Sequence, residues 1–248
     1  MNREKNEKAL PLRIPNLPFV AALLILIGLG VVLYVSMTDN GVGLTNDSAD
    51  YLVGARALLA GDGYVRYSGD RAPRPITQFP PFYSVAIAEA VSLFKLPDVF
   101  AGARIVNGIA MALNLFLIAA LALAAARREF LAICAAVLTL LSAPFLQAEV
   151  YGLSEAWSSV WILAGLLGLS IALRKSRRRW WVWLLIGAIF GVAMLIRYAS
   201  LVFFAGAVFL AFANGRALRE RIEPVVFLSL GFGLLFTPWL IRNRLVGE

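Results

Sequence analysis

The most constraining feature of the sequence is a series of apolar runs, most of them long enough for a helix that crosses a membrane. The first covers residues 19–37, and later runs follow between short basic stretches. In a bilayer, every backbone N–H and C=O must be satisfied within the protein, so such runs form α-helices. Only 15% of the residues are charged, too few for a soluble globule of this length. The sequence therefore predicts an all-α polytopic membrane protein.

The basic residues indicate how the runs cross. Lys and Arg gather at the ends of apolar runs, at residues 127–128, 174–179 and 216–221, as they do on cytoplasmic sides of membranes. All three clusters lie on the cytoplasmic side only if the short apolar stretch 80–96 does not cross. The net charge of +8 is then a topology signal, and we expect no nucleic-acid partner.

The charge pattern predicts about seven spans in the cell (plasma or inner) membrane, in a single module over residues 1–248, with residues 1–17 as a cytoplasmic tail. The predicted spans are residues 19–37, 104–126, 130–147, 153–173, two short spans within 180–213 that turn at Arg197 and Tyr198, and 225–241. Glycines recur inside them and predict close helix packing. These glycines are Gly165, Gly168, Gly187, Gly191, Gly231 and Gly233.

Two absences narrow the chemistry. The sequence has no histidine and one cysteine, Cys134, which lies within an apolar run. A disulfide framework, a thiolate metal site and a Ser-His-Asp triad are therefore excluded. Any acid or base must be a carboxylate, a lysine or a tyrosine.

The long polar segment 38–103 is predicted to be an outer loop with two surface helices, at 47–60 and 80–96. Thr45 or Asn46 can cap the first helix, and Gly61 can end it. Asp47 then lies in the first turn, where free N–H groups favour a carboxylate. On this reading alone, Asp47 is either a functional group or only a cap on a solvated loop.

Acidic and basic side chains converge on the predicted outer face. They are Asp47, Asp50, Arg66, Arg71, Arg74, Arg104, Glu149, Glu155 and Arg197. Simpler interpretations exist for two of them: Glu155 suits the start of a helix, and Arg197 suits a helix end that reaches the membrane surface.

Several short patterns, taken in order, resemble a known family. They are Asp47 with Tyr51 four residues later, the A..LL.G.GY pattern from Ala55 to Tyr64, FPPFY from Phe79 to Tyr83, Ser154-Glu155, the LIRY arginine Arg197, and PWLIRN from Pro238 to Asn243. Together they resemble the membrane glycosyltransferases of the GT-C type, nearest to the family 39 branch of protein O-mannosyltransferases and lipid A aminoarabinose transferases. The second acid usual in that family is Ser48 here.

The resemblance implies transfer of a sugar from a polyprenyl-phosphate donor to an acceptor hydroxyl on the outer side of the membrane, with inversion. Asp47 matches the family's catalytic base. A cation would stabilise the leaving phosphate, with Arg197 as first candidate and Arg104 as second. Asp50, Tyr51 and Glu155 would bind substrate, and Asp50 and Glu155 would hold a divalent cation if one is used. The acceptor would be a lipid, a glycan or a protein.

Two other classes of protein were weighed. A non-catalytic subunit that binds lipid phosphate, or an inactive fragment, fits the short chain, because proteins resembling it usually continue past the seventh span. A secondary transporter would need polar residues near the middle of its spans and repeated halves, and we expect neither from this sequence.

Overall fold

The computed structural model describes residues 15–68, 71–174, 179–215 and 217–247. Its elements are α1 (Leu17–Met37), α2 (Asn46–Ala60), β1 (Val65–Ser68), β2 (Arg71–Pro75), α3 (Phe82–Phe94), α4 (Val99–Ala126), α5 (Glu129–Leu140), α6 (Ala143–Val150), α7 (Ser154–Leu173), α8 (Trp180–Ile196), the 3-10 turn η1 (Tyr198–Ser200), α9 (Leu201–Asn214) and α10 (Leu218–Val246). The prediction of an all-α polytopic membrane protein is confirmed. Most of the predicted tail, residues 1–14, lies outside the described residues.

Four of the described helices are long and apolar enough to cross a membrane by themselves, namely α1, α4, α7 and α10. Helices α5 and α6 meet the same criteria only together, and they are bent by 63° where they join. Pro144 lies in the first turn of α6 and lacks the N–H that a continuous helix would need, which accounts for the break. Helices α8 and α9 are shorter, so the count of seven spans stays a prediction.

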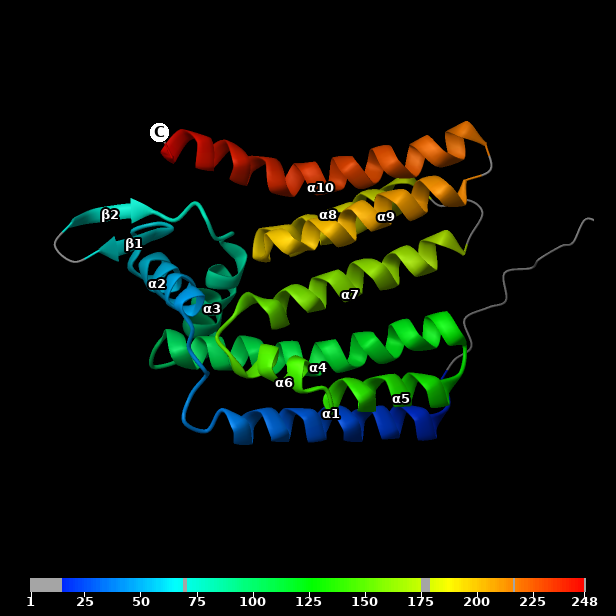
Figure 1. The fold of residues 1–248 in the computed structure, drawn as a ribbon, viewed down its shortest axis with the longest axis horizontal. Helices are drawn as coiled ribbons and strands as arrows, with labels where there is room; N and C mark the ends of the chain where they lie inside the picture. The colour runs from blue at the N-terminus through cyan, green and yellow to red at the C-terminus, as the bar shows by residue number, and fades with distance from the viewer. Residues whose placement is uncertain (1–14, 69–70, 175–178, 216, 248) are drawn as a thin grey trace, which may run out of the picture.

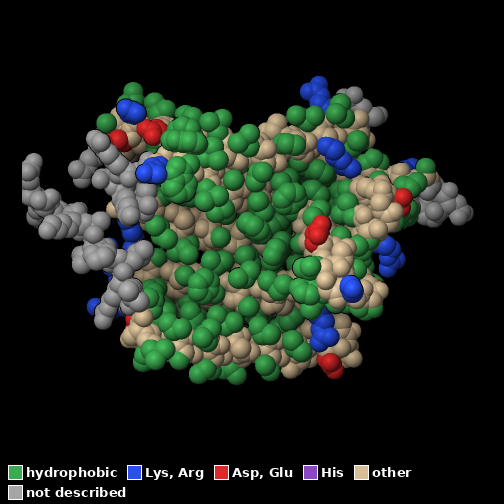
Figure 2. Space-filling view, turned by 180° about the vertical axis from the view of Figure 1, so that it is seen from behind, with side chains coloured by type: hydrophobic (Ala, Val, Ile, Leu, Met, Phe, Trp, Pro, Cys, Tyr) green, Lys and Arg blue, Asp and Glu red, His purple; other side chains and the backbone are tan. Residues whose placement is uncertain are grey.

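The long helices lie side by side, and the chain alternates between the two ends of the bundle (Figure 1). One end, here called the loop end, carries α2, α3, the β1–β2 hairpin, the α8–η1 junction and the last turns of α10. The other end carries the described parts of the three basic clusters; residues 175–178 and 216 lie outside the description. Between the ends, apolar side chains predominate on the face that Figure 2 shows. Such a band suits contact with lipid.

The loop end differs from prediction in two details. Helix α3 begins at Phe82 with Pro81 as its N-cap, and its 13 residues span about 20 Å, less than the apolar thickness of a bilayer. The hairpin was not predicted: β1 and β2 pair antiparallel, with Arg66 opposite Arg74. Its strands have four and five residues, and β2 contains two prolines, which normally argue against a strand.

Helices α8 and α10 touch backbone to backbone at two glycines. A Cβ added to Gly187 would lie 2.0 Å from the carbonyl oxygen of Leu228, and one added to Gly231 would lie 1.9 Å from that of Leu184. Gly191 also faces α10, and Gly165 of α7 faces the ring of Phe190. A Cβ added to Gly168 of α7 would lie 3.3 Å from the Ile186 side chain of α8, so the predicted packing role holds for these five. Gly233 has only Thr237 of its own helix nearby.

Gly231→Ala is expected to lower stability by about 1–3 kcal/mol, because the added methyl group forces the two helices apart. Gly206→Ala is the matched control: no atom lies within 4 Å of its added Cβ, so alanine is expected to be neutral or mildly stabilising. Thermal unfolding midpoints in detergent measure both. Equal midpoints for the two variants would contradict the packing assignment.

Candidate active site

The start of α2 is fixed by reciprocal hydrogen bonds. The Thr45 hydroxyl accepts from the Ser48 N–H at 3.3 Å, and the Ser48 hydroxyl accepts from the Thr45 N–H at 3.1 Å. Ser48 is buried by this role, while Asp47 stays exposed in the first turn. The helix ends at Gly61 in the left-handed conformation (φ 82°), as predicted. The site of the family's usual second acid is therefore a capping residue here.

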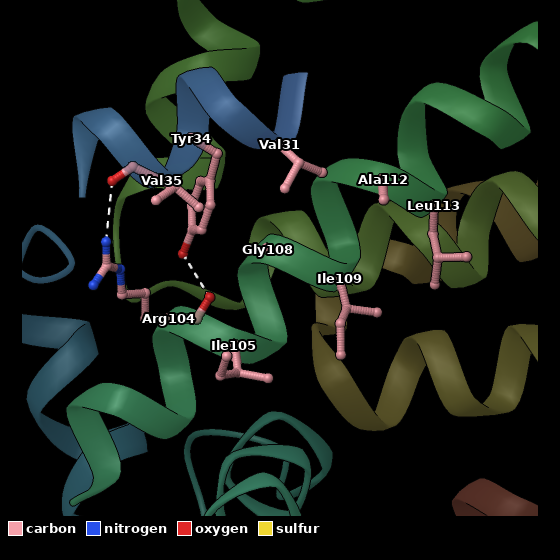
Figure 3. Close-up of a pocket in the computed structure, with 9 residues that line it drawn as sticks. All are labelled: Val31, Tyr34, Val35, Arg104, Ile105, Gly108, Ile109, Ala112 and Leu113. Atoms are coloured by element: carbon pink, nitrogen blue, oxygen red, sulfur yellow. Dashed lines mark hydrogen bonds between the residues drawn. The ribbon is translucent and has the colours of Figure 1, made fainter. Parts of the chain in front are cut away.

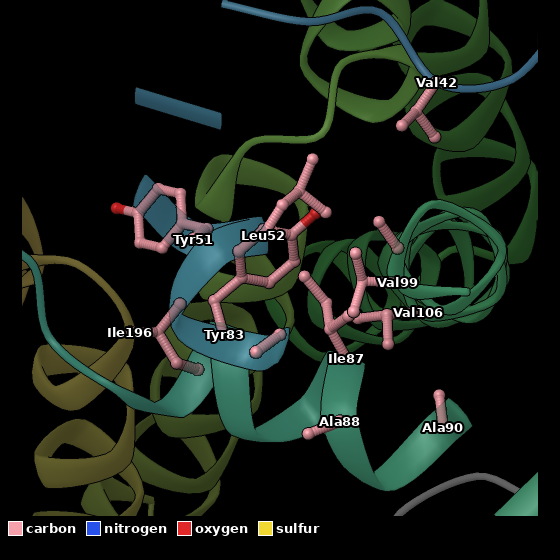
Figure 4. Close-up of a cluster of buried hydrophobic side chains, with 12 residues drawn as sticks. Val42, Tyr51, Leu52, Tyr83, Ile87, Ala88, Ala90, Val99, Val106 and Ile196 are labelled. Atoms are coloured by element: carbon pink, nitrogen blue, oxygen red, sulfur yellow. The ribbon is translucent and has the colours of Figure 1, made fainter. Parts of the chain in front are cut away.

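Tyr51 holds α2 against the rest of the loop end. Its ring packs against those of Phe79 and Tyr83, with centroids 5.1 and 5.2 Å away, and its carbonyl accepts from the Ser84 hydroxyl at 2.8 Å. The same buried cluster includes Ile196, the last residue of α8 (Figure 4). Helix α2 is thus packed next to the α8–η1 junction.

The tyrosine hydroxyl faces a group of charged side chains. It is hydrogen-bonded to the Ser154 hydroxyl at 2.9 Å, and the next residue, Glu155, pairs with Arg197 at 2.8 Å. Burial raises the pKa of Tyr51, so it stays protonated at neutral pH, and the charges of Arg197, Glu155 and Asp47 act on the same hydroxyl. Asp47, Tyr51, Ser154, Glu155 and Arg197 are together called the charged cluster below. Asp47 has no hydrogen-bond or ion-pair partner among the described residues.

Arg197 lies where the chain changes direction. Helix α8 ends at Ile196, and Arg197 has an extended backbone (φ −152°) before η1 begins. Ser200 secures this turn: its hydroxyl is 3.1 Å from the Ala193 carbonyl and 2.9 Å from the Ser158 hydroxyl of α7. The predicted turn at Arg197 and Tyr198 is confirmed. The arginine side chain is 38% exposed, so it is open to a ligand.

Asp50 lies on the hairpin side of α2. It pairs with Arg66 at 3.4 Å and accepts a hydrogen bond from the Gln78 side chain at 3.2 Å. Within the described part of the chain, no three acidic or cysteine side chains gather as a metal site. Asp50 and Glu155 each have a guanidinium partner, so each would have to share or exchange it to bind a divalent cation.

Arg104 lies apart from the charged cluster, where an apolar groove between α1 and α4 reaches the loop end (Figure 3). Its guanidinium donates to the Thr38 hydroxyl at 3.1 Å and to the Val35 carbonyl at 3.0 Å. These contacts give hydrogen-bond partners to oxygen atoms at the carboxyl end of α1. The structure therefore does not bring Arg104 together with Asp47 and Glu155.

A buried polar network behind the cluster was missed by the sequence interpretation. Asn107 and Asn114 of α4 and Glu149 of α6 are all fully buried, although Glu149 was expected at the outer surface and no polar residue was expected near the middle of a span. The Asn107 amide donates to the carbonyls of Glu149 and Tyr151 at 2.9 and 2.6 Å. The seven-residue spacing of the two asparagines, on one helix face, was the available signal.

The network supports a backbone link across the site. The Gly43 N–H donates to the Val150 carbonyl at 3.0 Å, and the Gly152 N–H donates to the Gly43 carbonyl at 2.8 Å. Gly43 precedes the cap of α2, and Gly152 precedes α7. The chain segments that lead to Asp47 and to Glu155 are therefore joined directly.

The PWLIRN pattern also has a structural role that the sequence did not reveal. Arg242 of α10 donates to the carbonyls of Ile76 and Tyr64 at 2.6 and 3.0 Å. The Trp239 ring N–H donates to the Tyr198 hydroxyl at 2.8 Å, and that hydroxyl is 3.3 Å from the Thr77 carbonyl. Helix α10 therefore connects the base of the hairpin, through hydrogen bonds, with the turn that carries Arg197.

Comparison with known proteins identifies a family for the chain. A model of the family described as dolichyl-phosphate-mannose-protein mannosyltransferase matches residues 78–241, more than half of the chain. The matched segment contains Arg104, Glu155 and Arg197, and it begins after Asp47, Asp50 and Tyr51. No curated protein and no solved structure matches the chain.

Proposed function

Because the chain belongs to the dolichyl-phosphate-mannose-protein mannosyltransferase family and is thus a membrane glycosyltransferase of the GT-C kind, we propose a specific reaction for it. The protein transfers a sugar from a polyprenyl-phosphate donor to an acceptor hydroxyl at the loop end, with inversion. The observation that carries the proposal is the charged cluster, which combines an unpaired carboxylate, Asp47, with an accessible arginine. The loop end faces the outside of the cell membrane.

Asp47 acts as the general base in this proposal. Its carboxylate is exposed and has no partner among the described residues, so it is free to accept a proton. The acceptor hydroxyl attacks the anomeric carbon of the sugar while its proton moves to Asp47. The bond from that carbon to the phosphate oxygen breaks on the opposite face, and the polyprenyl phosphate leaves.

Arg197 stabilises the leaving phosphate, which gains negative charge as the bond breaks. Its pairing with Glu155 holds the guanidinium in one orientation, and an arginine has further N–H groups to offer the phosphate. Asp50, beside the hairpin, is available to bind sugar hydroxyls. Tyr51 forms the buried wall between α2 and α7. Arg104 lies outside the cluster, so this proposal assigns it no contact with the leaving phosphate.

The proposal is tested by incubating the purified protein in liposomes with a panel of radiolabelled polyprenyl-phosphate hexoses and pentoses, together with lipid, glycan and protein acceptors. We expect one donor to be consumed, with release of polyprenyl phosphate in proportion to protein. Binding of a donor without any consumption would instead show a non-catalytic lipid-phosphate subunit. No binding of any donor would refute the proposal altogether.

The outward orientation predicts an asymmetric labelling result. In a Cys134→Ser background, we expect Lys95→Cys at the loop end to react with an impermeant thiol reagent added to intact cells. Arg128 is exposed at the end opposite the loop end, so Arg128→Cys should react only after the membrane is opened. The reverse pattern would place the charged cluster in the cytoplasm.

A further inference from the structure

The side chains of Glu149 and Asn114 form a buried pair between three helices. Both are fully buried, and the Asn114 amide nitrogen donates to Glu149 Oε1 at 2.7 Å. The same nitrogen donates to the Ala156 carbonyl, in the first turn of α7, at 3.0 Å. Asn114 therefore connects α4 with both α6 and α7, and its two N–H donors are both used.

Two oxygen atoms of this pair have no hydrogen-bond partner. They are Glu149 Oε2 and Asn114 Oδ1, both buried, and each belongs to a planar group that already takes part in the 2.7 Å bond. If Glu149 were ionised, both atoms would be acceptors facing no donor. The described residues also give Glu149 no cationic partner, and a buried, unpaired carboxylate is costly.

A proton on Glu149 resolves both problems, because a neutral carboxylic acid has one O–H donor. We propose that Glu149 is a neutral acid that donates its Oε2–H to Asn114 Oδ1, closing a doubly bonded acid–amide pair that positions Ser154 and Glu155. The pair fixes the start of α7 through the Ala156 carbonyl. Asn107 fixes the preceding segment through the carbonyls of Glu149 and Tyr151.

This arrangement makes Glu149 and Asn114 positioning residues, since neither touches the charged cluster directly. They act on it through the first turn of α7, where Ser154 contacts Tyr51 and Glu155 contacts Arg197. Their effect on turnover rests on the proposed function. The acid–amide pair itself, and its role in keeping the start of α7 ordered, do not depend on that function.

The decisive comparison is between Glu149→Gln and Glu149→Leu. Glutamine keeps Oε1 as an acceptor and offers an N–H where the acid offered its O–H, so it reproduces a neutral acid and not a carboxylate. We expect Glu149→Gln to match the wild type in thermal midpoint and in hydrogen exchange of residues 154–158. Glu149→Leu and Asn114→Leu should both speed that exchange. Thr139→Val is the control, because the Thr139 hydroxyl bonds only within its own helix, to Ala135.

Two further readouts separate this proposal from the proposed function. Infrared spectra should show the carbonyl stretch of a protonated carboxylic acid in the wild type that Glu149→Gln removes. Turnover should fall by on the order of 100-fold in the leucine variants, because misplacement by about 1 Å has an effect of that size. If glutamine behaves like leucine, or the infrared band is absent, the neutral pair is refuted. If exchange in the leucine variants equals that of the wild type, the positioning role is refuted, whether or not sugar is transferred.

Discussion

Asp47→Asn is expected to lower the rate of sugar transfer by about 100- to 10,000-fold, the usual cost of losing a positioned general base. The amide keeps the shape of the side chain at the first turn of α2, but it cannot accept the proton of the acceptor hydroxyl. The cap itself is unaffected, because Thr45 and Ser48 form it. Expression, thermal midpoint and donor affinity should therefore stay near the wild-type values. Turnover of the labelled donor, measured under saturating donor, gives the size of the loss.

Asp50→Asn is the matched control on the same helix, one turn away. Its carboxylate already pairs with Arg66 and Gln78, so it is not free to act as the base. We expect a loss of about tenfold or less, seen mainly as weaker substrate binding. Equal losses for the two variants, or an active Asp47→Asn, would remove Asp47 from its role.

Arg197→Gln is expected to lower turnover by about 100- to 1,000-fold, the usual effect of removing a group that stabilises developing negative charge. Donor affinity should fall as well, because the arginine also attracts the phosphate before the bond breaks. Both quantities are measurable in detergent, with donor binding followed by equilibrium dialysis and turnover by release of polyprenyl phosphate.

Arg66→Gln provides the comparison for Arg197. The two arginines have nearly the same exposure, 37% and 38%, and each pairs with a carboxylate at the loop end. Only Arg197 belongs to the charged cluster, so only its loss should affect the leaving phosphate. Retained donor affinity in Arg197→Gln, or an equal defect in Arg66→Gln, would contradict the phosphate role.

The sequence predicted those parts of the fold that depend on local patterns. Apolar runs predicted the helix bundle, and Gly61 predicted the end of α2 because glycine readily takes the left-handed conformation that closes a helix. The turn at Arg197 was predicted because a charge in an apolar stretch is least costly at a membrane surface. These features can be predicted without knowing which helices contact one another.

The rest depends on contacts between distant residues. The bond between Asn114 and Glu149 and the link between Gly43 and Gly152 join segments with no common pattern. Arg104 was a reasonable phosphate ligand by charge and siting alone, but it is held by the end of α1. The sequence around Arg104 does not show whether its side chain binds the end of a helix or is available to bind a ligand.

The contacts of Arg242 bear on the order in which the protein is made. The segment with Tyr64 and Ile76 leaves the ribosome early, but the side chain that binds its carbonyls lies 178 and 166 residues later in the chain. Until α10 is inserted, the base of the hairpin has no such anchor, and neither does Tyr198 beside Arg197. The base of the hairpin and the turn that carries Arg197 therefore lack these contacts while the intervening helices are being made. The groups proposed to act on lipid-linked sugars reach their final arrangement only when α10 is in place.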